Sequence, residues 1–117
     1  MRTALLAVWL LSIASAFAGG PALKCKIGPA TKIFGGSPWL VYACDDKHSV
    51  LVIAAPRSAA APFYFMFAYG AGGYRLRGEG AGNEAATDAA YKDLSQLKTP
   101  EVASLFNDAA IAPQAVR

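Results

Sequence analysis

The sequence predicts an α+β domain in which a four- or five-stranded antiparallel meander is followed by two C-terminal helices packed on one sheet face. Three observations support this fold class. Short runs rich in β-branched and aromatic residues, separated by turn residues, fill the chain as far as residue 80. The hydrophobic period then changes from two to about 3.6. Two helix-start signals follow this change.

Residues 1–18 are predicted to be a cleavable signal peptide. Arg2 is a short basic start, residues 4–11 form an apolar run, and residues 16–18 form a small-residue cleavage site, with a second such site two residues earlier. The apolar run is too short to cross the hydrocarbon core, which takes about 20 residues. We therefore expect residues 19–117 to be exported as a single small domain, secreted or periplasmic, with no membrane span after cleavage.

The two cysteines of the chain, Cys25 and Cys44, are predicted to form a disulfide bond. Export would place them in a compartment where disulfides persist. Closing a loop of this length contributes on the order of 3 kcal/mol in the chain-entropy model. A redox role is disfavoured because the sequence has no CxxC pair and no base beside either cysteine.

The first part of the domain reads as strands separated by turns. Gly28-Pro29 interrupts the N-terminal segment, and of the pieces 23–27 and 31–34 we expect only the first to be a strand. The uninterrupted apolar run 50–54 is expected to be a central strand with both faces at least partly covered. Residues 39–44 are expected to be its hairpin partner, joined to it through a polar loop at 45–48.

Residues 63–69 and 74–79 are predicted to form a second hairpin around a glycine-rich turn. In the second arm, Tyr74 and Leu76 alternate with charged residues, so one face looks inward and the other faces water. In the first arm both alternating sets are apolar. Two helices cover only one face of a sheet, so the other face is closed by the N-terminal segment, by a partner chain or by a ligand.

The helices are predicted from their capping residues. Asn83 is expected to cap the first helix, with Glu84 in its first turn. Thr99 is expected to cap the second helix, with Pro100 and Glu101 in its first turn. Apolar residues then recur with helical spacing until Pro113 ends the pattern.

The charge distribution argues against nucleic acid as a partner. Residues 19–80 carry seven basic and three acidic residues, and residues 81–117 carry three basic and five acidic residues. Phosphate-backbone binding needs a much denser basic footprint. The uneven distribution instead predicts a mildly basic sheet region, suited to anionic partners such as acidic cell-surface polymers.

No catalytic, metal or cofactor motif is found in the sequence. The single histidine, His48, has Asp45 and Asp46 nearby, but these are too few ligands for a specific metal site, and a polar hairpin tip is the expected role. Residues 78–83 superficially match a glycine-rich phosphate loop, but Asn83 occupies the place of its third glycine. We therefore expect no metal and no cofactor.

The leading functional hypothesis is a non-enzymatic, exported binding module that uses an aromatic sheet face with a basic rim. Its partner would be an envelope or extracellular macromolecule. One alternative is a hydrolase of envelope polymers that uses a carboxylate pair drawn from Asp45, Asp46 or Glu79. Another alternative is a homo-oligomeric structural component. The predicted binding residues are Trp39, Tyr64, Tyr74, Arg75 and Arg77, with Lys24 and Lys26 extending the basic rim.

Overall fold

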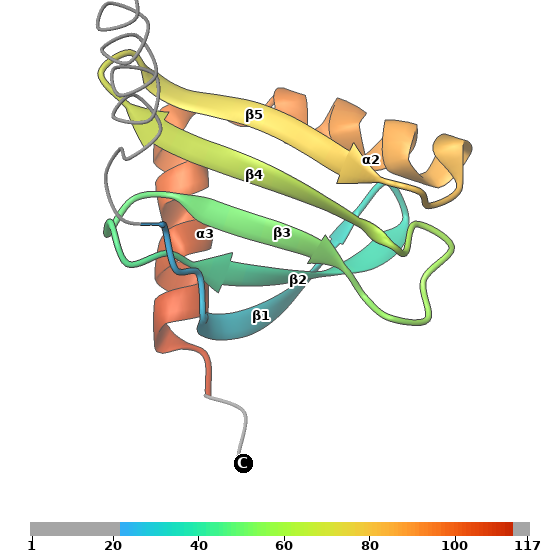
Figure 1. Cartoon of the computed structure of the whole chain (residues 1–117), viewed down its shortest axis with the longest axis horizontal. Helices are drawn as coiled ribbons and strands as arrows, with labels where there is room; N and C mark the ends of the chain where they lie inside the picture. Colours follow the sequence, from blue (N-terminus) through green and yellow to red (C-terminus); the bar gives the residue numbers. More distant parts are fainter. Residues whose placement is uncertain (1–21, 114–117) are drawn as a thin grey trace, which may run out of the picture.

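The structure, a computed structural model that describes residues 22–113, has one five-stranded antiparallel sheet followed by two helices (Figure 1). The predicted signal peptide, residues 1–18, lies outside the described residues. The elements are β1 (Ile27–Phe34), β2 (Ser37–Ala43), β3 (Val50–Ala54), β4 (Phe63–Gly70), β5 (Gly73–Gly80), α2 (Glu84–Ser95) and α3 (Thr99–Ile111).

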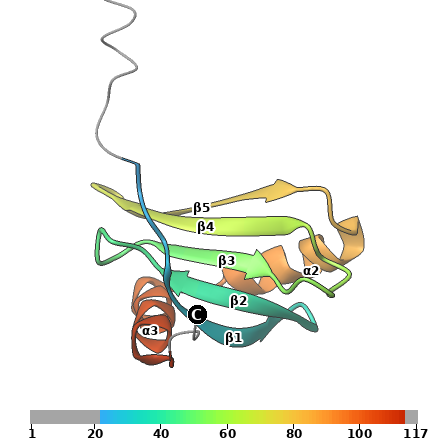
Figure 2. The same cartoon turned by 60° about the horizontal axis from the view of Figure 1, so that its bottom comes forward.

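Each strand pairs with its neighbour in the chain, and the strand order is β1-β2-β3-β4-β5. Both helices lie on the same side of this sheet (Figures 1 and 2). Helix α3 packs mainly against β1 and β2, and α2 contacts β1. The predicted α+β meander with two C-terminal helices on one face is confirmed.

The first strand differs from its prediction. Residues 23–26 are not part of the sheet, whereas β1 begins at Ile27 and continues through Gly28-Pro29 to Phe34. The pairing register shifts between Ile27 and Ala30, so the interruption is absorbed as a bulge. Pro29 is tolerated because β1 is an edge strand, where a missing N–H need not break the ladder.

The core lies between the sheet and the helices. Alternate residues of the three central strands point into it, and the largest of them is Trp39, which is fully buried. The Trp39 ring packs on Phe65 with ring centroids 5.3 Å apart, and its Nε1 donates a hydrogen bond to the Phe34 carbonyl oxygen at 3.1 Å. The other buried residues of the central strands are Val41, Ala43, Val50, Val52, Ala54, Phe65 and Phe67.

The helix starts follow their predicted caps closely. Asn83 caps α2, because its Oδ1 accepts a hydrogen bond from the Ala86 N–H at 3.0 Å. Helix α3 is capped one residue earlier than predicted, at Lys98, whose N–H donates to Glu101 Oε1 at 2.7 Å. Thr99 is therefore the first helical residue rather than the cap, which leaves Pro100 and Glu101 in the first turn.

Polar contacts also attach the helices to the β1–β2 hairpin. The Gly35 N–H in its turn donates to Asp93 Oδ2 of α2 at 2.6 Å. Gly35 has φ +61°, and a Cβ there would lie 2.4 Å from the Ala90 nitrogen, so only glycine allows this approach of turn and helix. Lys32 of β1 forms an ion pair with Asp108 of α3 at 2.7 Å.

Candidate interaction surface

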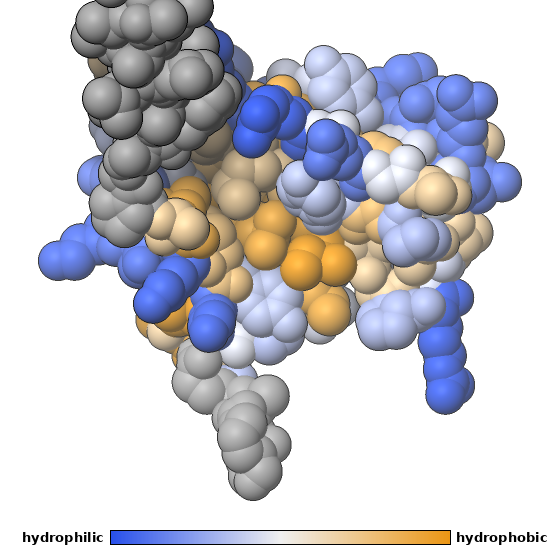
Figure 3. Space-filling model, viewed as in Figure 1, coloured by the Kyte–Doolittle hydropathy of each residue, from blue (hydrophilic) through white to orange (hydrophobic). Residues whose placement is uncertain are grey.

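The sheet face turned away from the helices is here called the open face. Figure 1 is viewed onto this face, and no described element lies across its centre. Figure 3 shows hydrophobic residues gathered at the centre, with hydrophilic residues around them. The strand register places on the open face Ile33 from β1, Leu40 and Tyr42 from β2, Leu51 and Ile53 from β3, Tyr64, Met66 and Ala68 from β4, and Arg75, Arg77 and Glu79 from β5.

Within residues 22–113, neighbouring side chains alone shield the apolar centre of the open face. Leu51, Ile53 and Met66 are half-buried, and Tyr64 is 37% exposed. The helices therefore cover one face of β3, and the other face is only partly covered, by cross-strand neighbours. Because isolated apolar residues are common on surfaces but contiguous apolar patches are not, this arrangement is a candidate binding surface.

A depression of about 1170 Å³ lies at one end of the open face, where the β3–β4 connection forms a wall beside the sheet. The connection brings Pro56, Ala61 and Pro62 against the strands. Most residues that line the depression are apolar, and the charged residue among them is Glu79. The lining residues from the strands are Leu51, Ile53, Ala54, Phe63, Tyr64, Glu79 and Gly80.

Tyr64 and Glu79 are cross-strand partners on the open face. The Tyr64 hydroxyl donates a hydrogen bond to Glu79 Oε1 at 2.8 Å. This hydrogen bond, together with the negative charge of Glu79, raises the pKa of Tyr64 above its ordinary value of 10.0. Tyr64 is therefore neutral at physiological pH, and it fixes the carboxylate at the edge of the depression.

Arg75 and Arg77 form the basic rim of the open face. Both are exposed, and they lie opposite Ala68 and Met66 of β4. The ion pair found among residues 22–113 joins Lys32 to Asp108 on the other side of the sheet. Within that part of the chain, the two arginines thus border the apolar centre without a carboxylate at ion-pair distance.

Tyr64, Arg75 and Arg77 are the predicted binding residues that the structure brings together on the open face. Trp39 is buried in the core, so the open face does not include it. Tyr74 also points to the helix side, where its ring contacts Phe67 and Tyr69, and its hydroxyl donates to the His48 carbonyl oxygen at 3.0 Å. Burial raises the pKa of Tyr74 above 10.0, so it too stays neutral.

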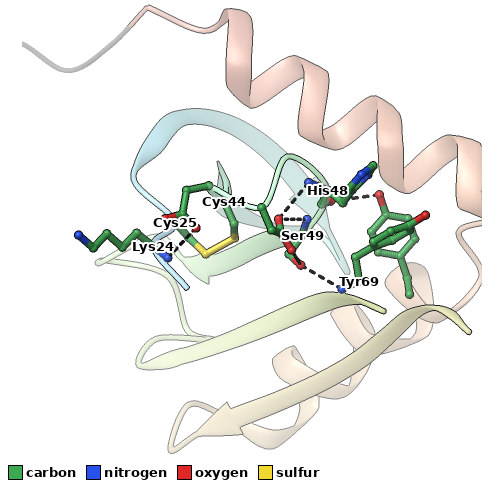
Figure 4. The surroundings of a disulfide bond; sticks show 9 residues. Lys24, Cys25, Cys44, His48, Ser49 and Tyr69 are labelled. Atoms are coloured by element: carbon green, nitrogen blue, oxygen red, sulfur yellow. Dashed lines mark hydrogen bonds between the residues drawn. A yellow bond between two sulfur atoms is a disulfide. The ribbon is translucent and has the colours of Figure 1, made fainter. Parts of the chain in front are cut away.

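The predicted lysines of the rim lie in the segment that precedes β1. The Lys24 N–H donates to Asp45 Oδ1 at 3.2 Å, and the Lys24 carbonyl oxygen accepts from the Asp45 N–H at 2.8 Å. Both Lys24 and Lys26 are exposed. Lys24 therefore lies beside the β2–β3 hairpin, at the end of the sheet where the disulfide joins Cys25 to Cys44 (Figure 4).

The predicted binding residues do not include three apolar residues of the open face, Leu51, Ile53 and Met66. The signal that identifies them is strand register: Leu51 pairs with Met66, and Ile53 pairs with Tyr64. Cross-strand partners share a face, and so do alternate residues of one strand. Once Tyr64 is placed on the open face, Ile53, Leu51 and Met66 must therefore lie there as well.

Asp46 holds the β2–β3 hairpin, whose residues His48 and Ser49 lie beside Tyr69 of β4 (Figure 4). Asp46 Oδ1 accepts hydrogen bonds from the N–H groups of His48 at 3.0 Å and Ser49 at 2.7 Å, and its Oδ2 accepts from the Ser49 hydroxyl. Ser49 Oγ in turn accepts from the Tyr69 N–H of β4 at 2.9 Å. The His48 ring stacks on Tyr69 with centroids 4.1 Å apart. This cluster is a structural brace rather than a catalytic Ser-His-Asp arrangement. The Asp46 carboxylate accepts directly from the Ser49 hydroxyl, and the His48 imidazole does not lie between them.

Replacing Asp46 with alanine is expected to destabilise the protein by about 1–3 kcal/mol, because the buried Ser49 hydroxyl loses its acceptor. Burial alone would raise the pKa of Asp46, but the hydrogen bonds from Ser49 and His48 outweigh it and hold the pKa below 3.8. The stabilisation is therefore complete above pH 3.8 and is lost as the pH falls through the lower folded-state pKa.

Urea unfolding at several pH values measures this effect. The matched control is Asp88→Ala, because Asp88 is an exposed carboxylate on α2. We expect the difference in stability between wild type and Asp46→Ala to shrink at acid pH. A difference that stays constant down to full protonation would contradict the assignment.

Of the carboxylates considered for a hydrolase, Glu79 does not face Asp45 or Asp46. Asp45 and Asp46 lie in the β2–β3 hairpin next to Tyr69, whereas Glu79 pairs with Tyr64. Tyr64 and Tyr69 are five residues apart on β4, a separation of roughly 16 Å along the strand. Among residues 22–113, no three His, Cys, Asp or Glu side chains gather closely enough to hold a metal ion.

The glycine-rich segment 78–82 is a close-packing site rather than an open anion loop. The Ala81 N–H donates to the Pro62 carbonyl oxygen at 2.8 Å, and the Asn83 N–H donates to that of Ala59 at 3.0 Å. A Cβ at Gly82 would lie 1.8 Å from the Ala60 carbonyl oxygen. The glycines therefore let this segment pack against the β3–β4 connection, which accepts the hydrogen bonds of the Ala81 and Asn83 N–H groups.

Comparison of the chain with protein-family models, with curated proteins and with solved structures finds no match. Neither helix of the described chain has the length and hydrophobicity that a bilayer crossing requires.

Proposed function

We propose that this chain is an exported binding module that takes an amphipathic, acidic macromolecule of the envelope or the extracellular space on its open face. The observation that carries the proposal is the apolar centre of that face, bordered by Arg75 and Arg77. The Cys25–Cys44 disulfide supports export, because such bonds persist in oxidising compartments.

The chemistry of the open face defines what fits it. Apolar groups of the partner would contact Leu51, Ile53 and Met66, which lose the rest of their water contact on binding. Acidic groups of the partner would meet the guanidinium groups of Arg75 and Arg77, which suit bidentate recognition of carboxylate or phosphate. Binding of this kind weakens as salt concentration rises, because exposed charges are screened.

Tyr64→Ala is expected to weaken binding by about 2 kcal/mol, or roughly thirtyfold, because exposed tyrosines at the centre of an interface are common hot spots. Binding is measured with the partner retained from envelope extracts on immobilised protein, over a series of salt concentrations. The native protein is also expected to bind a hydrophobic dye, and Ile53→Lys is expected to abolish that signal.

Tyr91→Ala is the matched control. Tyr91 lies on α2 and is 50% exposed, so the same side chain is removed from the helix side of the molecule. We expect it to retain both partner and dye. If the wild type binds neither, or if the two tyrosine variants behave alike, the open face is not the binding surface.

A further inference from the structure

Strand β5 has a free outer edge. It is the last strand of the sheet and, within the described chain, pairs with β4 alone. Both helices lie on the core side of the sheet, which leaves this edge uncovered (Figure 2). Residues Arg75 and 77–80 are exposed. An open edge of this length is a template for pairing with another strand.

Two hydrogen bonds show which backbone groups point outward from β5. The Tyr69 N–H of β4 points to Ser49 Oγ on the β3 side, and the Ala81 N–H donates to the Pro62 carbonyl oxygen. Together with the register, these bonds place the even-numbered residues of β4 opposite odd-numbered residues of β5 in hydrogen-bonded pairs. The N–H and C=O groups of Tyr74, Leu76, Gly78 and Gly80 therefore face the free edge.

The two edges of the sheet differ in how they are protected. β1, at the other edge, contains Pro29 and a bulge, which are devices that discourage strand addition. β5 extends over Gly73–Gly80 with neither a proline nor a lysine. Its charged residues, Arg75, Arg77 and Glu79, all project onto the open face rather than across the edge.

The charge order along β5 is complementary to itself. When two copies of β5 are placed antiparallel with Gly78 opposite Gly78, Arg77 lies opposite the partner's Glu79, and symmetry repeats the pair. In the register that instead centres Leu76, Arg75 lies opposite the partner's Arg77, and like charges directly across from each other are unfavourable. Cross-strand charge therefore selects the register centred on Gly78.

We propose that two copies of this chain associate through their β5 edges into one ten-stranded sheet. The outward N–H and C=O groups of Leu76, Gly78 and Gly80 supply the main-chain hydrogen bonds, and the two Arg77–Glu79 pairs fix the register. The open faces then lie on the same side and join. The basic rim of each copy becomes the middle of a larger surface.

The dimer is tested without any binding partner, so its failure and that of the proposed function are distinguishable. The mass of the purified protein is measured by size-exclusion chromatography with light scattering over a concentration series. We expect twice the chain mass. Glu79→Arg, which replaces two attractive pairs with two repulsive ones, is expected to weaken the dimer about tenfold. The double variant Arg77→Glu/Glu79→Arg is expected to restore it.

Asp88→Arg is the matched charge reversal on α2, away from β5, and should leave the mass unchanged. Amide hydrogen exchange separates edge pairing from face-to-face packing, because only edge pairing slows exchange at Leu76 and Gly78 as the protein concentration rises. A monomer at every soluble concentration overturns the proposal. So does a dimer whose Leu76 and Gly78 amides remain unprotected, or one that Glu79→Arg leaves unchanged.

Discussion

Replacing Cys25 and Cys44 with alanine is expected to lower the free energy of unfolding by about 3 kcal/mol. The bond joins residues 19 positions apart and attaches the segment before β1 to the end of β2. Two hydrogen bonds between Lys24 and Asp45 also attach that segment to the β2–β3 hairpin. Alanine is preferred to serine because Cys44 is fully buried, and a hydroxyl there would need a partner.

Guanidinium unfolding followed by circular dichroism, with and without a reductant, measures the loss. Reductant should lower the stability of the wild type toward that of the double variant and should leave the variant unchanged. If the wild type is equally stable in both conditions, the disulfide does not contribute as expected.

Trp39→Ala is expected to cost about 3–5 kcal/mol, which is a large share of the 5–15 kcal/mol that holds a typical domain folded. The indole is fully buried between the sheet and the helices, so its removal leaves a cavity and breaks the ring contact with Phe65. Thermal unfolding measures the effect, and complete loss of the cooperative transition is within the expected range.

Trp39→Phe is the control for Trp39→Ala. It keeps most of the buried area but removes the Nε1 hydrogen bond to Phe34, so a loss of about 1 kcal/mol is expected beyond the difference in size. If alanine and phenylalanine cost the same, packing of the indole is not what stabilises this part of the core.

The strands and helices were predictable where a single local rule decides the structure. Asn83 at the start of α2 is an example, because an asparagine before a helical pattern caps the helix by accepting a hydrogen bond from a first-turn N–H. The alternation of Tyr74 and Leu76 with Arg75 and Arg77 also gave the correct faces of β5, because only one of the two sets is apolar.

Facing was not predictable where both alternating sets of a strand are apolar. In β2, Trp39, Val41 and Ala43 alternate with Leu40 and Tyr42, so the pattern does not say which set meets the helices. The burial of Trp39 is decided by tertiary packing against Phe65 and by its bond to Phe34. Tyr74 is among the predicted binding residues because it is aromatic. Its alternation with Arg75 and Arg77 along β5, however, predicts that it points inward, as the structure shows.

The first strand was mispredicted because local and tertiary preferences conflict there. Gly28-Pro29 is a strong turn signal, and locally it separates two extended pieces. In the folded protein Gly28 adopts φ +127°, and a Cβ there would lie 2.9 Å from the Val41 carbonyl oxygen, so the glycine serves a bulge that packs closely on β2. A bulge of this kind depends on the neighbouring strand, which a local pattern does not contain.

The strand order has a consequence for how the chain acquires its fold. Because every strand pairs with the next one along the chain, the sheet can grow by successive hairpins, each closing a short loop at small entropic cost. Docking of α3 onto β1 and β2 joins the two ends of the described chain, so we expect it to come last. Until both helices dock, the growing chain exposes core residues such as Trp39, Phe65 and Phe67. A chain that stops before residue 99 would therefore keep its hairpins but remain prone to aggregation.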